Sequence, residues 1–365
     1  MKRIYIILVV AICGLVACRQ RYDPPVNSAK KAFLVVEANL NPQGPATISL
    51  TRTLPLETGG TVKGELNAQV TVEGKDNTTR TLVGLGNGRY TSINLNLIIN
   101  NEYRLRIKTT DGKEYVSAFM KAKKTPVIDS IGWEKEKDGM RIYANTKDVA
   151  NSTRYYRWDF DETWEIRSVF FSAYIYDNGV IRNRIFPAEA CNVCWKYSTS
   201  STIVLANSTR LANDVIFKAP IQFIENGSEK LYIRYSIMLR QYALDREAYN
   251  FFELMRKNTE DIGSLFSPQP SEIRGNITCV NDPTDYVLGY VTASTIEAKR
   301  QFIQVPWQFF QDCRIVRVPA IADSIKFFFG PGGNLIPFAY DDPPPVYFGS
   351  TAECVDCRAR GGSTA

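Results

Sequence analysis

The sequence predicts a mainly β protein of two domains that follows a cleaved leader. Three observations predict this fold class. Short stretches in which apolar and polar residues alternate recur along most of the chain, glycine, proline and asparagine turn signals separate them, and a single segment shows the spacing of an amphipathic helix. We expect a β-sandwich over residues 32–125 and a larger β-rich domain over residues 126–365.

The first 31 residues predict an export signal and a flexible tether. Lys2 and Arg3 precede an apolar run over residues 4–17, which suits a signal peptide and is too short to span a bilayer comfortably. The run ends in LVAC and resembles the bacterial lipobox, whose cysteine becomes the lipidated first residue of the mature protein. We therefore expect a signal peptide at 1–17, a lipid anchor at Cys18 and a tether at 18–31. An ordinary signal peptide followed by a chance cysteine is the alternative.

Residues 32–125 contain short alternating stretches with turn signals between them. The stretches cover residues 32–40, 46–54, 68–73, 81–85, 89–97, 102–109 and 113–120. GNG at 86–88 and DG at 111–112 mark turns between neighbouring strands. Short strands at this spacing predict a β-sandwich of the Ig-like kind. GRY at 88–90, with Tyr103 and Tyr115 further on, also resembles the carboxypeptidase-regulatory sandwich of other exported proteins.

The larger domain is predicted to combine many strands with one helix and a cysteine-rich C-terminal tail. Near residues 244–261 the apolar residues fall at helical spacing, and Gly263 follows as a stop signal. Strands are expected at residues 127–133, 140–144, 155–169, 231–239, 273–279, 287–294, 300–304, 315–318 and 324–329.

Composition argues against several classes of function. The chain has no histidine, which excludes histidine-dependent triads, histidine metal ligands and histidine proton shuttles. The net charge of +6 falls by two when Lys2 and Arg3 are removed, and lysines and arginines form no block, so a nucleic-acid surface is not expected. No recognisable catalytic or cofactor motif occurs. We therefore expect no enzymatic activity, no cofactor and no metal.

Six cysteines remain once Cys13 leaves with the signal peptide and Cys18 carries lipid. They are Cys191, Cys194, Cys279, Cys313, Cys354 and Cys357. In an exported protein they predict disulfides. The two Cys-x-x-Cys pairs also match the spacing of zinc thiolates or of a redox motif. The sequence leaves open whether each pair closes locally or the two pairs cross-link, and a Cys279–Cys313 disulfide is the residual pairing.

Residues 155–169 contain candidate ligand-binding residues. Apolar side chains, two tryptophans among them, fall on one face of this predicted strand, and Asp159 and Asp161 fall on the other. Paired carboxylates, with Glu162 beside them, serve glycoside hydrolysis or calcium binding, whereas a solvated strand face is the structural alternative. Trp195 follows a cysteine in a predicted loop, where an exposed ring could stack on a sugar. Asp159, Asp161 and Trp195 are therefore the ligand-binding candidates.

Five phrases together resemble the Bacteroidetes lipoprotein family called domain of unknown function 4249. They are FLVVEA at 33–38, YYRW at 155–158, the stretch from PQP to GNI at 268–277, VLGYVTAS at 287–294 and CVDCRARGG at 354–362. The last phrase is the most specific. The family has no established activity, and its members tend to sit beside TonB-dependent outer-membrane receptors. The resemblance implies a cell-envelope role in uptake or surface binding.

The functional hypothesis is a lipid-anchored binding or accessory component of a TonB-dependent transport system. Its expected partners are the membrane, through the lipid at Cys18, and a TonB-dependent receptor. The outer membrane is favoured over the inner one because no aspartate follows Cys18. Two alternatives remain: a hydrolase of glycans or peptides that uses Asp159, Asp161 or Glu162, and a structural envelope protein.

Overall fold

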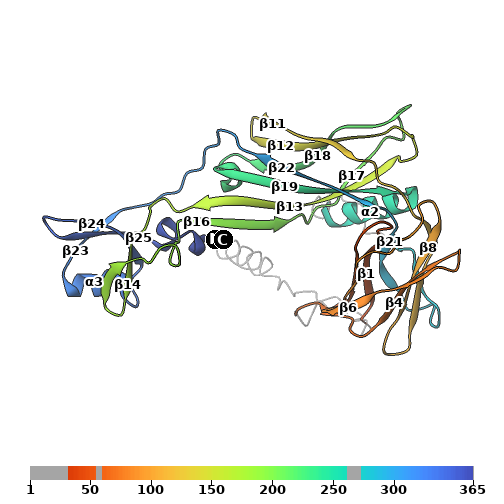
Figure 1. Ribbon diagram of the computed structural model, residues 1–365, viewed down its shortest axis with the longest axis horizontal. Coiled ribbons are helices and arrows are strands. Elements are labelled where there is room, and N and C mark those ends of the chain that lie inside the picture. Colours follow the sequence, from red (N-terminus) through yellow and green to blue (C-terminus); the bar gives the residue numbers. More distant parts are fainter. Residues whose placement is uncertain (1–31, 55–59, 261–272, 365) are drawn as a thin grey trace, which may run out of the picture.

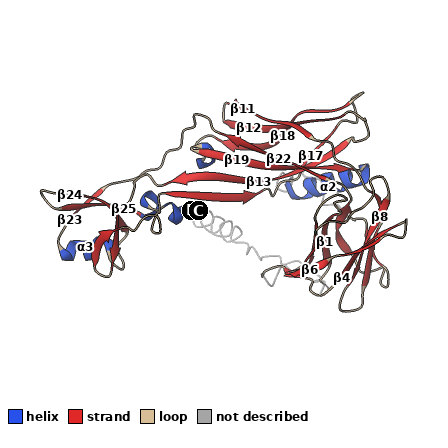
Figure 2. Ribbon diagram, in the orientation of Figure 1, coloured by secondary structure: helices blue, strands red, loops and turns tan. Residues whose placement is uncertain are grey.

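A computed structural model describes residues 32–54, 60–260 and 273–364. The chain forms two β-sandwiches and a small β-rich module, which we call the tip module. The first sandwich lies below one end of the second sandwich, and the tip module lies at the other end (Figures 1 and 2). The predicted mainly β fold class is confirmed. The leader, Cys18 and the tether lie outside the described residues. Within the described part, no helix has both the length and the apolar character needed to cross a bilayer.

The first sandwich consists of two six-stranded sheets. One sheet has the order β21-β1-β2-β7-β6 with β3 beside β2, and the other has the order β20-β9-β8-β4-β5 with β10 beside β8. Their bounds are β1 (Leu34–Asn39), β2 (Ala46–Arg52), β3 (Lys63–Gly64), β4 (Gln69–Gly74), β5 (Thr79–Thr81), β6 (Val83–Gly86), β7 (Arg89–Ser92), β8 (Glu102–Lys108), β9 (Glu114–Ser117), β10 (Met120–Lys121), β20 (Ile277–Cys279) and β21 (Val287–Thr292). Alternate residues of each sheet, such as Val36 and Leu105, meet in one buried core. Each of the seven stretches predicted in this region overlaps an observed strand.

Strands β20 and β21 correct the predicted domain boundary, because they come from residues that we had assigned to the second domain. β21 runs parallel to β1, with Leu34 opposite Val287, and β20 pairs with β9. Ile277, Val287 and Val291 are buried in the first core. Gly289 has a φ of +111°, and a Cβ there would lie 1.9 Å from the carbonyl oxygen of Val36, so the close parallel pairing requires glycine. The first sandwich is therefore built from two distant parts of the chain.

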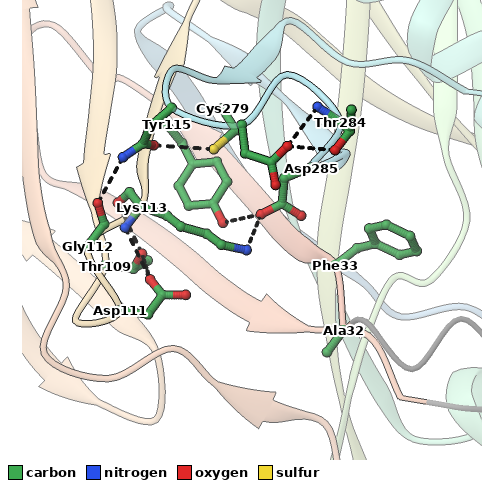
Figure 3. Close-up of polar contacts among 12 residues, drawn as sticks. Ala32, Phe33, Thr109, Asp111, Gly112, Lys113, Tyr115, Cys279, Thr284 and Asp285 are labelled. Atoms are coloured by element: carbon green, nitrogen blue, oxygen red, sulfur yellow. Dashed lines mark hydrogen bonds and ion pairs between the residues drawn. The ribbon is translucent and has the colours of Figure 1, made fainter.

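The buried carboxylate of Asp285 fastens the loop before β21 to the first sandwich (Figure 3). Lys113 Nζ lies 2.5 Å from Asp285 Oδ2, and the Tyr115 hydroxyl donates to the same oxygen at 3.0 Å. Burial raises the pKa of Tyr115, which keeps its hydroxyl protonated and able to donate. Asn281 Nδ2 also donates to the Gly112 carbonyl at 3.0 Å. These bonds join the returning loop to the turn between β8 and β9.

The second sandwich packs the β11-β12-β18 sheet against the β16-β13-β19-β22 sheet, in which β17 also pairs with β13. The bounds are β11 (Ile128–Glu136), β12 (Gly139–Asp148), β13 (Tyr155–Arg167), β16 (Val193–Thr199), β17 (Val204–Asn207), β18 (Asp214–Glu225), η1 (Glu229–Leu231), β19 (Arg234–Leu244) and β22 (Ile296–Ile303). Trp158 and Trp164 are buried on the predicted apolar face of β13. The alternation of residues 155–169 therefore assigned the two faces of this strand correctly.

Helix α2 (Arg246–Glu260) lies between the two sandwiches, as Figure 1 shows. It forms at the position predicted by the helical spacing near residues 244–261. Its Phe251 and Phe252 pack with Tyr242 of β19 in a third hydrophobic cluster. The Phe251 ring lies 5.0 Å from the ring of Tyr290 in β21. The helix therefore connects the first sandwich to one end of the β16-β13-β19-β22 sheet.

The tip module lies at the opposite end of the molecule from the first sandwich (Figure 1). Its elements are β14 (Tyr174–Asp177), β15 (Val180–Asn183), β23 (Val316–Pro319), α3 (Ala322–Phe329), β24 (Leu335–Asp341) and β25 (Val346–Thr351), followed by α4 (Ala352–Val355) and η2 (Cys357–Arg360). The strand predicted at 324–329 is wrong, since these residues form α3, and the prediction of one helix is corrected with it. The phenylalanines at 327–329 suggested a strand. Asp323 instead lies in the first turn of a helix, where a negative charge is favourable, and the helix ends at Gly330, whose N–H donates to the Lys326 carbonyl.

Two disulfides brace the junction between the second sandwich and the tip module. They are Cys194–Cys357, which joins the two Cys-x-x-Cys pairs, and Cys313–Cys354. Cys191 and Cys279 are free and buried, so the prediction that all six cysteines form disulfides is wrong, as is the residual Cys279–Cys313 pair. Cys279 lies in the first sandwich, where it cannot reach the others. Burial raises the pKa of the Cys191 thiol and keeps it protonated.

We expect thiol labelling to find two free cysteines in the unreduced protein. A soluble form that starts at Arg19 should label at Cys191 and Cys279 when it is unfolded without reductant, and at all six cysteines after reduction. Mass spectrometry of the labelled peptides identifies the positions. Absence of label at Cys191, or label at Cys194 before reduction, would contradict the pairing.

Candidate ligand-binding face

All three predicted ligand-binding residues lie on one face of the β16-β13-β19-β22 sheet. We call this the outer face, because the opposite face packs against the β11-β12-β18 sheet. Asp159 and Asp161 are on β13, and Trp195 is on β16 opposite Glu165. Alternation along each strand assigns the outer face its members, which are Arg157, Asp159, Asp161, Thr163, Glu165, Trp195, Tyr197, Thr199, Arg234, Ser236, Met238, Arg240, Tyr242, Ile296, Ala298, Arg300 and Phe302.

Trp195 differs from its prediction, because it lies in a strand rather than a loop and is half-buried. Its backbone N–H donates to the Ser363 carbonyl at 2.8 Å, and the Ser363 N–H donates back at 3.0 Å. The C-terminal tail therefore extends along β16 at this point. Trp195 belongs to the outer face but is not its most exposed ring.

Arg240 is the cation that faces the paired carboxylates. It lies on β19 directly opposite Asp159 and pairs with both Asp159 and Asp161. The Arg240 hydrogen bond, opposed in part by burial, lowers the pKa of Asp161. A general acid requires a carboxyl whose pKa is raised, so this geometry favours an ionised Asp161 that accepts hydrogen bonds.

Hydrogen bonds extend from this ion pair across the sheet. Thr199 Oγ1 donates to Asp161 Oδ1 at 3.1 Å, and the Tyr197 hydroxyl lies 2.7 Å from Thr199 Oγ1. On the other side, Arg157 Nη2 lies 3.5 Å from Asp159 Oδ2. The outer face therefore carries a continuous array of polar groups whose positions are fixed by their neighbours.

Two exposed aromatic rings stand at the sides of the outer face, and sequence reasoning missed both. Tyr197 on β16 is 69% exposed and Phe302 on β22 is 60% exposed. Thr163 and Ser236 lie between them on the two central strands, in register with both. Phe302 is next to Ile303 in the chain, and neighbouring residues of a strand point to opposite faces. This pattern predicts an exposed Phe302 only when Ile303 is known to face inward.

Glu162 lies on the opposite, buried face and is only 2% exposed. Tyr235 donates its hydroxyl to Glu162 at 2.7 Å, Lys230 Nζ lies at 2.6 Å, and Gln222 Nε2 donates at 3.3 Å. The hydrolase alternative drew on Asp159, Asp161 and Glu162, but the strand separates Glu162 from the other two. Glu162 therefore forms an internal ion pair rather than part of the outer face.

The C-terminal CVDCRARGG motif closes one end of the second sandwich. Cys357 forms its disulfide with Cys194 of β16, and Arg360 Nη2 donates to Glu229 of η1 at 2.9 Å. A Cβ at Gly362 would lie 2.6 Å from the Cβ of Cys194, which explains the glycine. The motif therefore has a structural part in holding the tail against β16.

The tip module offers a second exposed surface. Phe171 and Phe186 are exposed and stack on each other at 5.4 Å. On α3, Phe327 is exposed beside a hollow of about 710 Å³ that is also lined by Asp323 and Lys326. Apolar side chains exposed in such numbers are typical of contact surfaces.

The zinc alternative required free thiolates from the two Cys-x-x-Cys pairs. Three of the four Cys-x-x-Cys sulfurs are in disulfides. In the part of the chain that the structure describes, no group of three or more cysteine or acidic side chains is placed to hold a metal ion.

Comparisons with known proteins identify one family. A model of the family described as Domain of unknown function (DUF4249) matches residues 19–300, which cover nearly all of both sandwiches and end before the CVDCRARGG motif. No curated protein matches the chain. Among solved structures, the chain is similar to chitinase ChiA74 from Bacillus thuringiensis, with 12% identity over 55% of this chain and a TM-score of 0.15. It covers 29% of the chitinase chain, and a likeness this low bears on neither fold nor activity.

Proposed function

We propose that this chain, which belongs to the DUF4249 family of domains of unknown function, is a cell-envelope lipoprotein that binds a ligand for a TonB-dependent outer-membrane transport system. Lipid on Cys18 anchors it to the outer membrane. The first sandwich serves as a spacer, the outer face of the second sandwich binds the ligand, and the tip module contacts the receptor.

The position of Ala32, the first described residue, supports this arrangement. The described chain begins at Ala32 in the first sandwich, and the tip module lies at the other end of the molecule (Figure 1). A short tether from a lipidated Cys18 to Ala32 would hold the first sandwich near the membrane. The exposed rings of the tip module would then lie far from the attachment point, where they would contact the parts of a receptor that extend beyond the bilayer.

The observation that carries the binding role is the pair of exposed rings, Tyr197 and Phe302, on a face whose carboxylates are ion-paired with Arg240. Exposed aromatic rings are typical of contact surfaces, where an apolar ring can pack against a ligand. A glycoside hydrolase requires one carboxyl group held protonated as an acid, which the low pKa of Asp161 does not favour.

The test combines membrane fractionation with affinity purification from native membranes. The wild-type protein is expected in the outer-membrane fraction, and purification in mild detergent should recover a TonB-dependent receptor identified by mass spectrometry. Cys18→Ala removes the acylated thiol and should move the protein to the soluble fraction. A Cys18→Ala protein that stays membrane-bound would contradict the anchor, and wild-type protein that recovers no such receptor would contradict the association.

A further inference from the structure

We propose that the outer face between Tyr197 and Phe302 binds a neutral oligosaccharide chain. This inference deepens the proposed function by assigning a ligand class to the same face, and it rests on that function for its biological setting.

The two exposed rings lie across the sheet from each other. Tyr197, Thr163, Ser236 and Phe302 lie in register on four adjacent strands. Three strand spacings place the two aromatic residues about 14 Å apart across the sheet. Of the two side chains between them, Thr163 is half-buried, whereas Ser236 is only 4% exposed and accepts a hydrogen bond from Arg300. A ligand that spans the two exposed rings would therefore contact Thr163 and the Arg300 guanidinium.

Carboxylate, guanidinium and hydroxyl groups beside the rings are held in place by hydrogen bonds to one another. Asp161 accepts hydrogen bonds from Arg240 and Thr199, and a carboxylate offers about four lone-pair positions, so it can accept another from a ligand hydroxyl. Arg300 Nη1 donates to Ser236 Oγ at 2.8 Å, which holds both groups in place. A sugar hydroxyl both donates and accepts, so it suits a surface on which carboxylates and guanidinium groups alternate.

Charges of opposite sign nearly cancel on the outer face. Four arginines and three carboxylates share this face, namely Arg157, Arg234, Arg240, Arg300, Asp159, Asp161 and Glu165. A strongly acidic or basic ligand would therefore find little complementary potential. An apolar peptide would cover these ion pairs without replacing the hydrogen bonds that they make with water, which is costly. A neutral sugar chain avoids both penalties, because its C–H faces pack on the rings and its hydroxyls bond to the charged groups.

The experiment is a calorimetric titration of the full mature chain, in its Arg19 soluble form, with neutral hexasaccharides of β-1,4-, α-1,4- and β-1,3-linked sugars. At least one series should bind saturably. Tyr197→Ala and Phe302→Ala should each weaken binding about tenfold, the scale expected for one stacked ring. Tyr197→Phe should retain binding, because the ring remains.

Phe217→Ala is the matched control, since this ring is 73% exposed on β18 of the other sheet. Its affinity should equal that of the wild type, and circular dichroism should show all variants folded. Failure of every series to bind, equal weakening by Phe217→Ala, or binding of an extended peptide at this face in place of sugar would overturn the inference. Receptor recovery is measured separately, so sugar binding without a receptor would overturn only the proposed association.

Discussion

A fragment consisting of residues 32–125 is expected to remain unfolded when it is produced by itself. The first sandwich lacks β20 and β21 in this fragment, and the edges of β1 and β9 lose their partners. Ile277, Val287 and Val291 also leave the core. Burial of such a side chain contributes about 1.5–3 kcal/mol, so the loss is about 5–9 kcal/mol, comparable to the whole stability of a typical domain.

Circular dichroism and limited proteolysis measure this outcome. The control is a single chain in which residues 273–296 follow residue 125 through a flexible linker. It restores β20, β21 and the Asp285 contacts with Lys113 and Tyr115, and it should unfold cooperatively. A fragment 32–125 that unfolds cooperatively without the added segment would show that the returning strands are dispensable.

Glu162→Ala is expected to lower the free energy of unfolding by about 3–5 kcal/mol. The substitution leaves the Lys230 ammonium without its carboxylate, and the buried Tyr235 hydroxyl loses its acceptor. Removal of one partner from a buried pair costs this much because the other charge stays uncompensated. Denaturation in urea, monitored by tryptophan fluorescence, measures the change.

Asp161→Ala is the matched control on the neighbouring position of the same strand. Its carboxylate is also ion-paired, but it lies on the partly exposed outer face, where such pairs contribute about 1 kcal/mol or less. A Glu162→Ala variant as stable as Asp161→Ala would refute the assignment of Glu162 to a buried pair.

The faces of individual elements were predictable from local pattern. In β13 the period of two separated Trp158 and Trp164 from Asp159 and Asp161, because successive side chains of a strand point to opposite sides. The helical spacing that begins at Leu244 likewise predicted α2. By contrast, the run before Gly330 contains three adjacent phenylalanines, and such a short apolar run does not distinguish a strand from a helix.

The candidate site was predictable only in part. Asp159 and Asp161 were identified as a pair on the polar side of a strand, but Arg240, which forms ion pairs with both, lies about 80 residues further along the chain. Tyr197 and Phe302 were missed because their exposure depends on which strands become neighbours. The separation of Glu162 from the two aspartates follows from strand alternation, although the identity of its partner Lys230 does not.

Local spacing was sufficient to predict the β class, the position of helix α2 and the inward face of the central strand. Each depends on the spacing of residues a few positions apart. Tertiary structure decided that β21 returns to pair with β1, that Cys194 joins Cys357 while Cys191 stays a thiol, and which rings remain exposed. These outcomes depend on the free energies of contacts between residues far apart in the chain. Local periodicity carries no information about those contacts.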